Sequence, residues 1–155
     1  ELVNFISPGQ VVIAGEKKAV NSACELMKNA GAQRALVLPV SVPSHCSLMT
    51  SAAQEFFDSV AMVNFQIGAV SVLHNVDASI ANDINEIKSK LIEQLHRPVL
   101  WTSSVQKMKQ LGVEKLLELG PGKVLTGLVR RIDRSLSASA VIDTAKLQST
   151  IEEIA

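Results

Sequence analysis

Two mainly apolar runs, each followed by a helix-like pattern, constrain the fold of this chain more than any other feature. The runs cover residues 36–42 and 67–73, and the first is the core of a strand predicted over 34–42. Runs of this length and composition are typical of strands that are buried on both faces, as in parallel sheets. Because strands and helices alternate through the later part of the chain, the pattern predicts an α/β fold with a parallel sheet.

The other expected elements follow from apolar periodicity and from turn residues. Each helix is marked by an apolar stripe at helical spacing, and three of them end near Gly31, Pro98 or Gly112. Asp77 or Ser79 is expected to cap the helix that runs from about residue 80 to 95, and Asp143 the last helix. The further strands are expected at 3–6, 11–14, 113–119 and 138–142, and the further helices at 16–30, 49–60, 101–111, 124–132 and 144–154.

Composition excludes several classes of function. A chain of 155 residues suits one domain of ordinary size, and its formal net charge of zero gives no argument for nucleic acid or for an anionic membrane. Aromatic residues are few, which disfavours a base-stacking surface, and no apolar run is long enough for a membrane span. Cys24 and Cys46 have no metal-ligand spacing, and no signal peptide is visible, so we expect reduced thiols in a cytoplasmic protein.

His45 stands where an apolar strand gives way to a helix, directly after Pro43 and Ser44. A side chain in that position is held by rigid elements and can still face a cleft. Histidine is also the side chain best suited to moving protons near neutral pH. The alternative interpretation, a capping or core histidine, remains open at this level.

Five segments occur together in one order and spacing: residues 3–15, 39–46, 75–77, 94–101 and 119–125. In that arrangement the chain closely resembles the C-terminal half of bacterial malonyl-CoA:acyl-carrier-protein transacylases, a family that loads malonyl groups for fatty-acid synthesis. The resemblance covers nearly all of the chain. It implies that residues 1–41 are the end of a ferredoxin-like small subdomain. It also implies that residues 42–155 are the C-terminal part of an α/β hydrolase-like core with a parallel sheet.

The resemblance implies a role for His45. In the family, a serine attacks the thioester, and a histidine in the Pro-Ser-His motif takes up the serine proton and later returns one to the leaving thiol. His45 matches that histidine, and the backbone carbonyl of Gln94 matches the group that orients it. An ordinary polar residue near a helix end is the alternative for Gln94. Asn4, Ser44 and Val124 are expected by analogy to line the substrate pocket, although core or turn roles are open for Asn4 and Ser44.

The serine nucleophile is absent from these residues, since no Gly-x-Ser-x-Gly segment is present. The family's oxyanion-hole residues and its malonyl-binding arginine also belong to the other half. We therefore expect this chain to be inactive alone and to need the N-terminal half of the same enzyme. The other implied partners are acyl carrier protein and malonyl-CoA, which is a substrate, and no cofactor is expected to be permanently bound.

Three further features have competing interpretations. Arg130, Arg131 and Arg134 suggest a docking surface for an acidic carrier protein, or simply a solvated helix face. The segment 120–123 lacks the residues of a phosphate-binding loop and predicts a tight strand-to-helix turn, where a helix N-terminus favours anions weakly. His74, which replaces a common asparagine of the family, could be taken for a second acid or base.

Two other functions remain possible from the sequence. One is a non-catalytic α/β binding or scaffold module, and the other is an acyltransferase domain of a polyketide synthase.

Overall fold

The computed structural model of the protein describes the backbone of residues 1–154 and the side chains of residues 1–152. It begins with an antiparallel hairpin and a helix, as the sequence predicts. The hairpin turns at Gly9, whose φ of 75° is accessible to glycine without steric cost. The bounds are β1 Leu2–Ser7, β2 Gln10–Ile13 and α1 Lys17–Asn29.

The predicted strand over 34–42 is not formed. Residues 33–46 contain neither helix nor strand, and their apolar side chains are largely exposed, Leu36 at 64% and Val40 at 67%. The second predicted strand is also mostly missing, because only Leu73 of the run 67–73 enters a strand, and Val72 is 60% exposed. A strand needs a neighbour to satisfy its backbone groups. Among residues 1–154, no strand pairs with residues 34–42 or 67–72.

Two packed helices and a short hairpin form the middle of the chain. Helix α3 begins later than predicted, because Asp83 accepts a hydrogen bond from the Glu86 amide at 2.8 Å and caps it. Asp77 and Ser79 instead shape the turn of the hairpin, where Ala78 has a φ of 54°. The bounds are η1 Ser47–Met49, α2 Thr50–Ala61, β3 Leu73–His74, β4 Ser79–Ile80 and α3 Ile84–Glu93.

The C-terminal part contains a parallel strand pair with its crossover helix. Strands β5 and β6 pair in register from Lys115–Ser137 to Leu119–Val141. The main core lies between this pair and the helices α4 and α5, around Val105, Val129 and Leu136. The bounds are α4 Trp101–Gln110, β5 Lys115–Leu119, α5 Val124–Ile132, β6 Ser137–Val141 and α6 Thr144–Ile154.

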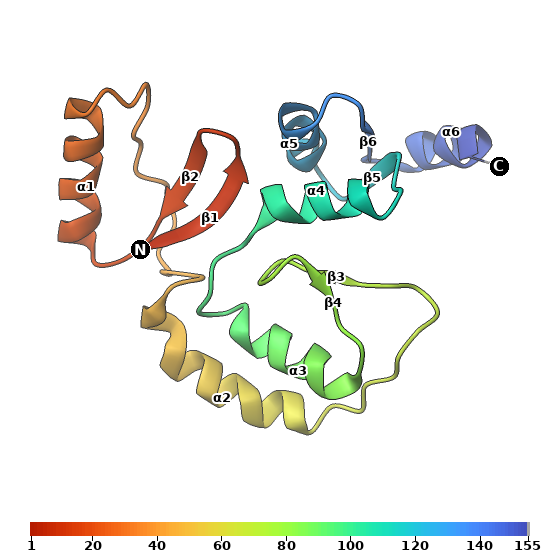
Figure 1. The fold of residues 1–155 in the computed structure, drawn as a ribbon, viewed down its shortest axis with the longest axis horizontal. Helices are drawn as coiled ribbons and strands as arrows, with labels where there is room; N and C mark the ends of the chain where they lie inside the picture. The colour runs from red at the N-terminus through yellow and green to blue at the C-terminus, as the bar shows by residue number, and fades with distance from the viewer. Residues whose placement is uncertain (155) are drawn as a thin grey trace.

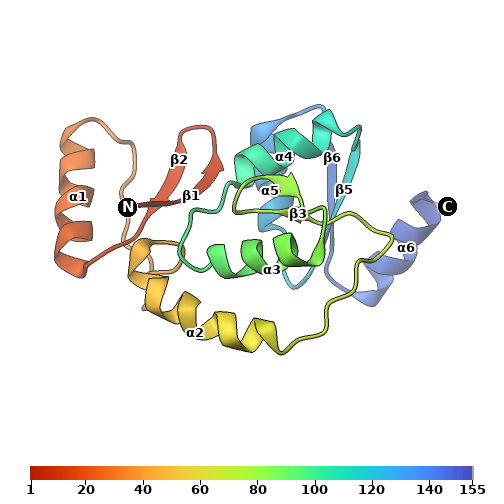
Figure 2. The same cartoon turned by 60° about the horizontal axis from the view of Figure 1, so that its bottom comes forward.

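The elements form an open arrangement, with the N-terminal hairpin and α1 at one end and α6 at the other (Figure 1). Helices α2 and α3 pack against each other, and α2 runs along the lower edge of the view in Figure 2. The hairpin is attached to the rest of the chain through backbone hydrogen bonds between β1 and Val99, both 2.9 Å long. The α/β class is as predicted, but the described residues hold only one parallel strand pair. None of the helices in the described part of the chain is long and apolar enough to cross a membrane.

Candidate active site

His45 is held by two hydrogen bonds to the end of helix α3. Its ring Nδ1 lies 2.6 Å from the backbone oxygen of Gln94, and its own amide donates to the oxygen of Leu95 at 2.9 Å. The residue is partly buried, and its φ of 68° lies in the left-handed region, which non-glycine residues seldom adopt. Strained backbone of this kind is found most often at functional sites, where surrounding contacts over-determine it.

The partner carbonyl is available because of where helix α3 ends. The last carbonyls of a helix have no intrahelical amide to bind, and Gln94 is the C-cap of α3. A carbonyl oxygen only accepts hydrogen bonds, so the proton of the neutral ring must be on Nδ1. The lone pair on Nε2 is therefore left to accept a proton from another group. This is the tautomer that a histidine base requires.

The peptide around His45 is fixed on both sides. The thiol of Cys46 is buried and donates a hydrogen bond to the oxygen of Pro43 at 3.1 Å. Ser47 donates through its amide to the Glu1 carboxylate at 3.0 Å. These contacts close a tight turn directly before α2, with Ser44 partly buried beside the histidine. The imidazole is therefore presented from an anchored turn.

The other predicted site residues make no direct contact of this kind with the pair. Asn4 is a partly buried residue of β1, and its backbone bridges to Val99, five residues after Gln94. Val124 is the first residue of α5 and is 70% exposed. No hydrogen bond within the described residues joins Asn4, Ser44 or Val124 to His45. The structure thus brings together His45 and Gln94 by direct contact, and brings Asn4 only to the neighbouring segment.

His74 is unsuited to be a second base. Its side chain is buried, and Nε2 has no hydrogen-bond partner in the described residues. Burial lowers the pKa of His74 below its ordinary value, and the nearby Lys90 ammonium lowers it further. His74 is only 6% exposed, so within the described residues a reacting group cannot reach it. The reading of His74 as an acid or base group is therefore not favoured by its surroundings.

The turn at 120–123 also differs from an anion site. The Glu118 carboxylate accepts the amides of Leu125 at 3.1 Å and Thr126 at 2.7 Å, so a side chain of this chain already occupies the N-terminus of α5. Burial would raise the pKa of Glu118, but the hydrogen bonds from Thr126 and Leu125 outweigh it and leave the pKa lowered. An added negative charge here would meet Glu118 first. The weak preference of this helix end for an anion is therefore already satisfied by the Glu118 carboxylate.

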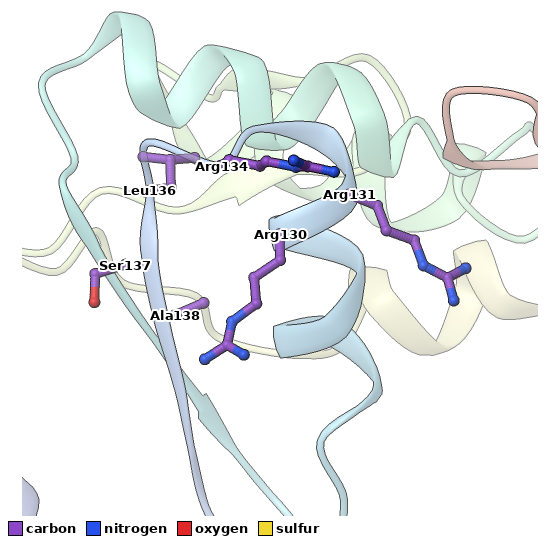
Figure 3. A pocket seen from close by; sticks show the side chains of 6 residues that line it. All are labelled: Arg130, Arg131, Arg134, Leu136, Ser137 and Ala138. Carbon is purple, nitrogen blue, oxygen red and sulfur yellow. The ribbon is translucent and has the colours of Figure 1, made fainter.

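A cavity of about 610 Å³ lies beside the end of α5 (Figure 3). Arg130 and Arg131 extend from the last turn of α5, and Arg134 comes from the loop that follows. Arg131 donates a hydrogen bond to the Gln10 side chain of the hairpin at 3.0 Å. The lining residues are Arg130, Arg131, Arg134, Leu136, Ser137 and Ala138. The wall is thus rich in cations, which fits both interpretations of these arginines, a docking surface and a solvated helix face.

One charged cluster was not expected from the sequence. Lys90 on α3 is only 5% exposed and contacts Asp77, Ser79 and Glu86. The spacing of Glu86 and Lys90, four residues apart on a helix, is the signal that could have indicated part of it.

Comparison with known proteins identifies relatives of one kind. The chain is 50% identical to the malonyl CoA-acyl carrier protein transacylase of Salmonella typhimurium over 151 residues, which are 97% of this chain and 49% of the relative. A crystal structure of an acyl carrier protein S-malonyltransferase from Vibrio cholerae is 53% identical, with a TM-score of 0.93 over 97% of this chain and 49% of that chain. A malonyl-transacylase solved with a type II polyketide-synthase acyl-carrier protein is 50% identical, with a TM-score of 0.96, and the match covers 99% of this chain and 50% of that one.

The chain spans about half the length of these relatives, and the matched half is C-terminal. No family model matches the sequence. In sequence and in fold, the chain therefore corresponds to the C-terminal half of malonyl CoA-acyl carrier protein transacylases, as the five sequence segments suggest.

Proposed function

We propose that this chain supplies the C-terminal half of a malonyl-CoA:acyl-carrier-protein transacylase, in which His45 is the general base and then the general acid. The observation that carries the proposal is the 2.6 Å contact between Nδ1 of His45 and the Gln94 carbonyl. That contact leaves Nε2 free to accept a proton. A core or capping histidine would have no need of a strained backbone and a dedicated acceptor.

In the proposed reaction, a serine of the N-terminal half attacks the thioester carbonyl of malonyl-CoA. Nε2 of His45 takes the hydroxyl proton as the new oxygen–carbon bond forms. The tetrahedral intermediate then collapses and the carbon–sulfur bond breaks. The sulfur of coenzyme A takes the proton from His45 and leaves as the thiol. In the second half-reaction, the phosphopantetheine thiol of the carrier protein gives its proton to His45 and attacks the malonyl-serine ester. The serine oxygen recovers that proton when the ester bond breaks.

The exposed apolar runs support the need for an N-terminal half. Segments 36–42 and 67–72 have the composition of buried strands but lie largely in solvent. Paired with further strands, they would extend the α/β core to which this half belongs. The proposed division places residues 1–41 in a small subdomain and residues 42–155 in the larger one. The backbone bonds between β1 and Val99 would then hold the two subdomains in contact.

The substrate pocket is proposed to lie around His45. Ser44 is adjacent to it in the chain, and Asn4 is held to the segment after Gln94 through the bridge to Val99. Val124 is exposed at the start of α5, and a further segment could pack over it. We propose these three residues as parts of the pocket wall.

The carrier protein is proposed to dock near the arginine-lined cavity. Acyl carrier proteins are acidic, and Arg130, Arg131 and Arg134 would attract them through charge complementarity. The relative that was solved with a carrier protein supports a partner of this class.

Cys24 and Cys46 are free thiols, which fits a reducing cytoplasm and an enzyme of fatty-acid synthesis.

The proposal is tested in the full-length protein that contains this chain. Purified His45→Ala protein should transfer labelled malonyl groups to carrier protein about a hundredfold to ten-thousandfold more slowly than wild type, because general acid–base catalysis is lost. Circular dichroism should show an unchanged fold. The matched control is His96→Ala, which removes an imidazole whose Nδ1 has no hydrogen-bond partner in the described residues and should leave transfer largely intact. A folded His45→Ala protein with near-normal transfer would refute the proposed role.

A further inference from the structure

Lys90 is a buried cation in the last turns of α3, and its ammonium is surrounded by oxygen atoms. It lies 2.5 Å from the Asp77 carboxylate and 3.0 Å from the Glu86 carboxylate, and it also donates to the Ser79 hydroxyl. Asp77 and Ser79 belong to the β3–β4 hairpin, whereas Glu86 lies on α3 itself. The ammonium thus joins a helix to a hairpin.

The charge on Lys90 is maintained in this site. Burial alone would lower the pKa of a lysine, but the hydrogen bonds to Asp77 and then Glu86 outweigh it, and the pKa is raised. The cation remains bound throughout the neutral pH range. The contact between helix and hairpin is therefore a permanent one and not a titrating switch.

The position of Lys90 connects this contact to the candidate active site. The backbone oxygen of Lys90 accepts the Gln94 amide at 3.0 Å, so both residues belong to the final turn of the helix. The backbone carbonyl of Gln94 in turn accepts the hydrogen bond from Nδ1 of His45. One peptide path of four residues therefore runs from the buried ammonium to the atom that sets the imidazole tautomer.

The hairpin end of the contact is itself fixed. The Asn75 backbone oxygen accepts the amide of Leu100 at 2.8 Å. Its side-chain oxygen lies 3.3 Å from the buried Ser104 hydroxyl, which also lies 2.9 Å from the Leu100 oxygen. Leu100 and Ser104 follow Gln94 in the chain, on the other side of the segment that carries it. The hairpin therefore braces this segment from both ends, once through Lys90 and once through Asn75.

We propose that Lys90 is a positioning residue for the reaction: its ammonium holds the last turn of α3 against the β3–β4 hairpin and so fixes the Gln94 carbonyl opposite His45. The inference rests on the proposed function only for its effect on rate. The predicted effect on the orientation and tautomer of the His45 imidazole does not depend on that function. Lys90 touches neither substrate nor the reacting atoms.

The test is made in the full-length protein with Lys90→Met, which keeps the hydrocarbon stem and removes the charge. The Asp77 carboxylate is 38% exposed and the Glu86 carboxylate 34%, so water can solvate both after the change and the fold should survive. Replacing a buried ion pair by a hydrophobic side chain is often tolerated. We expect kcat for malonyl transfer to fall by about tenfold to a hundredfold, because a small displacement of a reacting group is costly, while KM for malonyl-CoA stays unchanged.

A second readout follows the ring directly and needs no activity. In isotope-labelled protein, the nitrogen chemical shifts of His45 report which ring nitrogen carries the proton. Wild type should show Nδ1–H alone, and Lys90→Met should show a mixture of tautomers. Lys88→Met is the matched control on the same helix, because the Lys88 ammonium interacts with the Ala61 oxygen and the Phe65 ring and has no ion pair among the described residues. It should change neither readout.

The outcomes separate this inference from the proposed function. A folded Lys90→Met protein with unmoved His45 shifts overturns the inference, whatever its rate. If Lys90→Met does not fold, Asp77→Asn weakens the same contact from the hairpin side, and unmoved shifts in that variant overturn it equally. A wild-type protein that shows no malonyl transfer refutes the proposed function, while the ring measurement still decides the role of Lys90.

Discussion

Replacing Val72 by threonine tests whether the exposed apolar run 67–72 is covered by a further part of the protein. Threonine has nearly the shape of valine and suits an extended segment, but it places a hydroxyl where valine has a methyl group. In the 155-residue chain Val72 is 60% exposed, so the change alters a side chain that is mostly in water. Substitutions at such positions usually change stability by no more than about 0.5 kcal/mol.

A different result is expected in the full-length protein. Full burial of a valine side chain contributes about 1.5–3 kcal/mol, so covering the exposed 60% would contribute about 1–2 kcal/mol. Threonine would lose most of that and would also bury a hydroxyl without an assured partner, which costs about 1–3 kcal/mol. We therefore expect Val72→Thr to lower the free energy of unfolding of the full-length protein by about 2 kcal/mol or more.

Urea denaturation of wild type and variant measures this difference, in the full-length protein and in the 155-residue chain. Val129→Thr is the positive control, because Val129 is 2% exposed in the core of this chain and its replacement should destabilise both proteins. Equal stability of wild-type and Val72→Thr full-length protein would refute the reasoning, since it would mean that the run stays in solvent when the N-terminal half is present.

Three further outcomes are expected. Gln94→Ala should reduce malonyl transfer by less than about threefold, because the variant keeps the backbone carbonyl, and a loss above a hundredfold in a kinetic assay would instead implicate the side chain. Charge reversal of Arg130 and Arg131 to glutamate should raise KM for carrier protein about tenfold or more at low salt and leave KM for malonyl-CoA unchanged; an unaltered carrier KM would place docking elsewhere. The hydrogen bond from Lys109 first, and then those from the neighbouring serine, lower the pKa of Asp133 to about 2. Because the folded-state pKa is below the ordinary value of 3.8, the carboxylate stabilises the fold above that value, and its contribution disappears as the pH falls towards 2. Asp133→Asn should therefore lower the urea midpoint at pH 6 and have little effect near pH 2, whereas an equal effect at both would contradict the assignment.

The sequence predicted those elements whose partners lie within the same stretch of chain. The hairpin 2–13 needs only its own turn, and the pair β5–β6 needs only its own crossover helix, so apolar periodicity and turn residues were sufficient. The strands expected at 34–42 and 67–73 failed because a strand depends on a neighbour that these residues do not contain. The start of α3 was misplaced because Asp77 and Asp83 are equally good caps by composition, and only the hairpin contacts of Asp77 separate them.

The site was predictable to a different extent for each residue. His45 was suggested by its place at a change from apolar run to helix, but its acceptor came only from the resemblance to a family. The two residues are 49 positions apart, and no local pattern links them. Lys90 was missed because a lysine beside an apolar stripe normally lies in solvent. Lys90 is buried because the β3–β4 hairpin packs against it and supplies Asp77, which lies 13 positions earlier.

The bridge between β1 and Val99 has a consequence for the order in which the protein folds. The amide of Phe5 and the oxygen of Val99 are separated by 94 positions, so their bond can form only after a long loop has closed. Contacts that are distant in sequence form slowly, whereas α1, α2 and the β5–β6 crossover depend on neighbours. The segment after Gln94 therefore reaches its final place late. The bond between Phe5 and Val99 would then report that this loop has closed and that the N-terminal hairpin has joined the segment after Gln94.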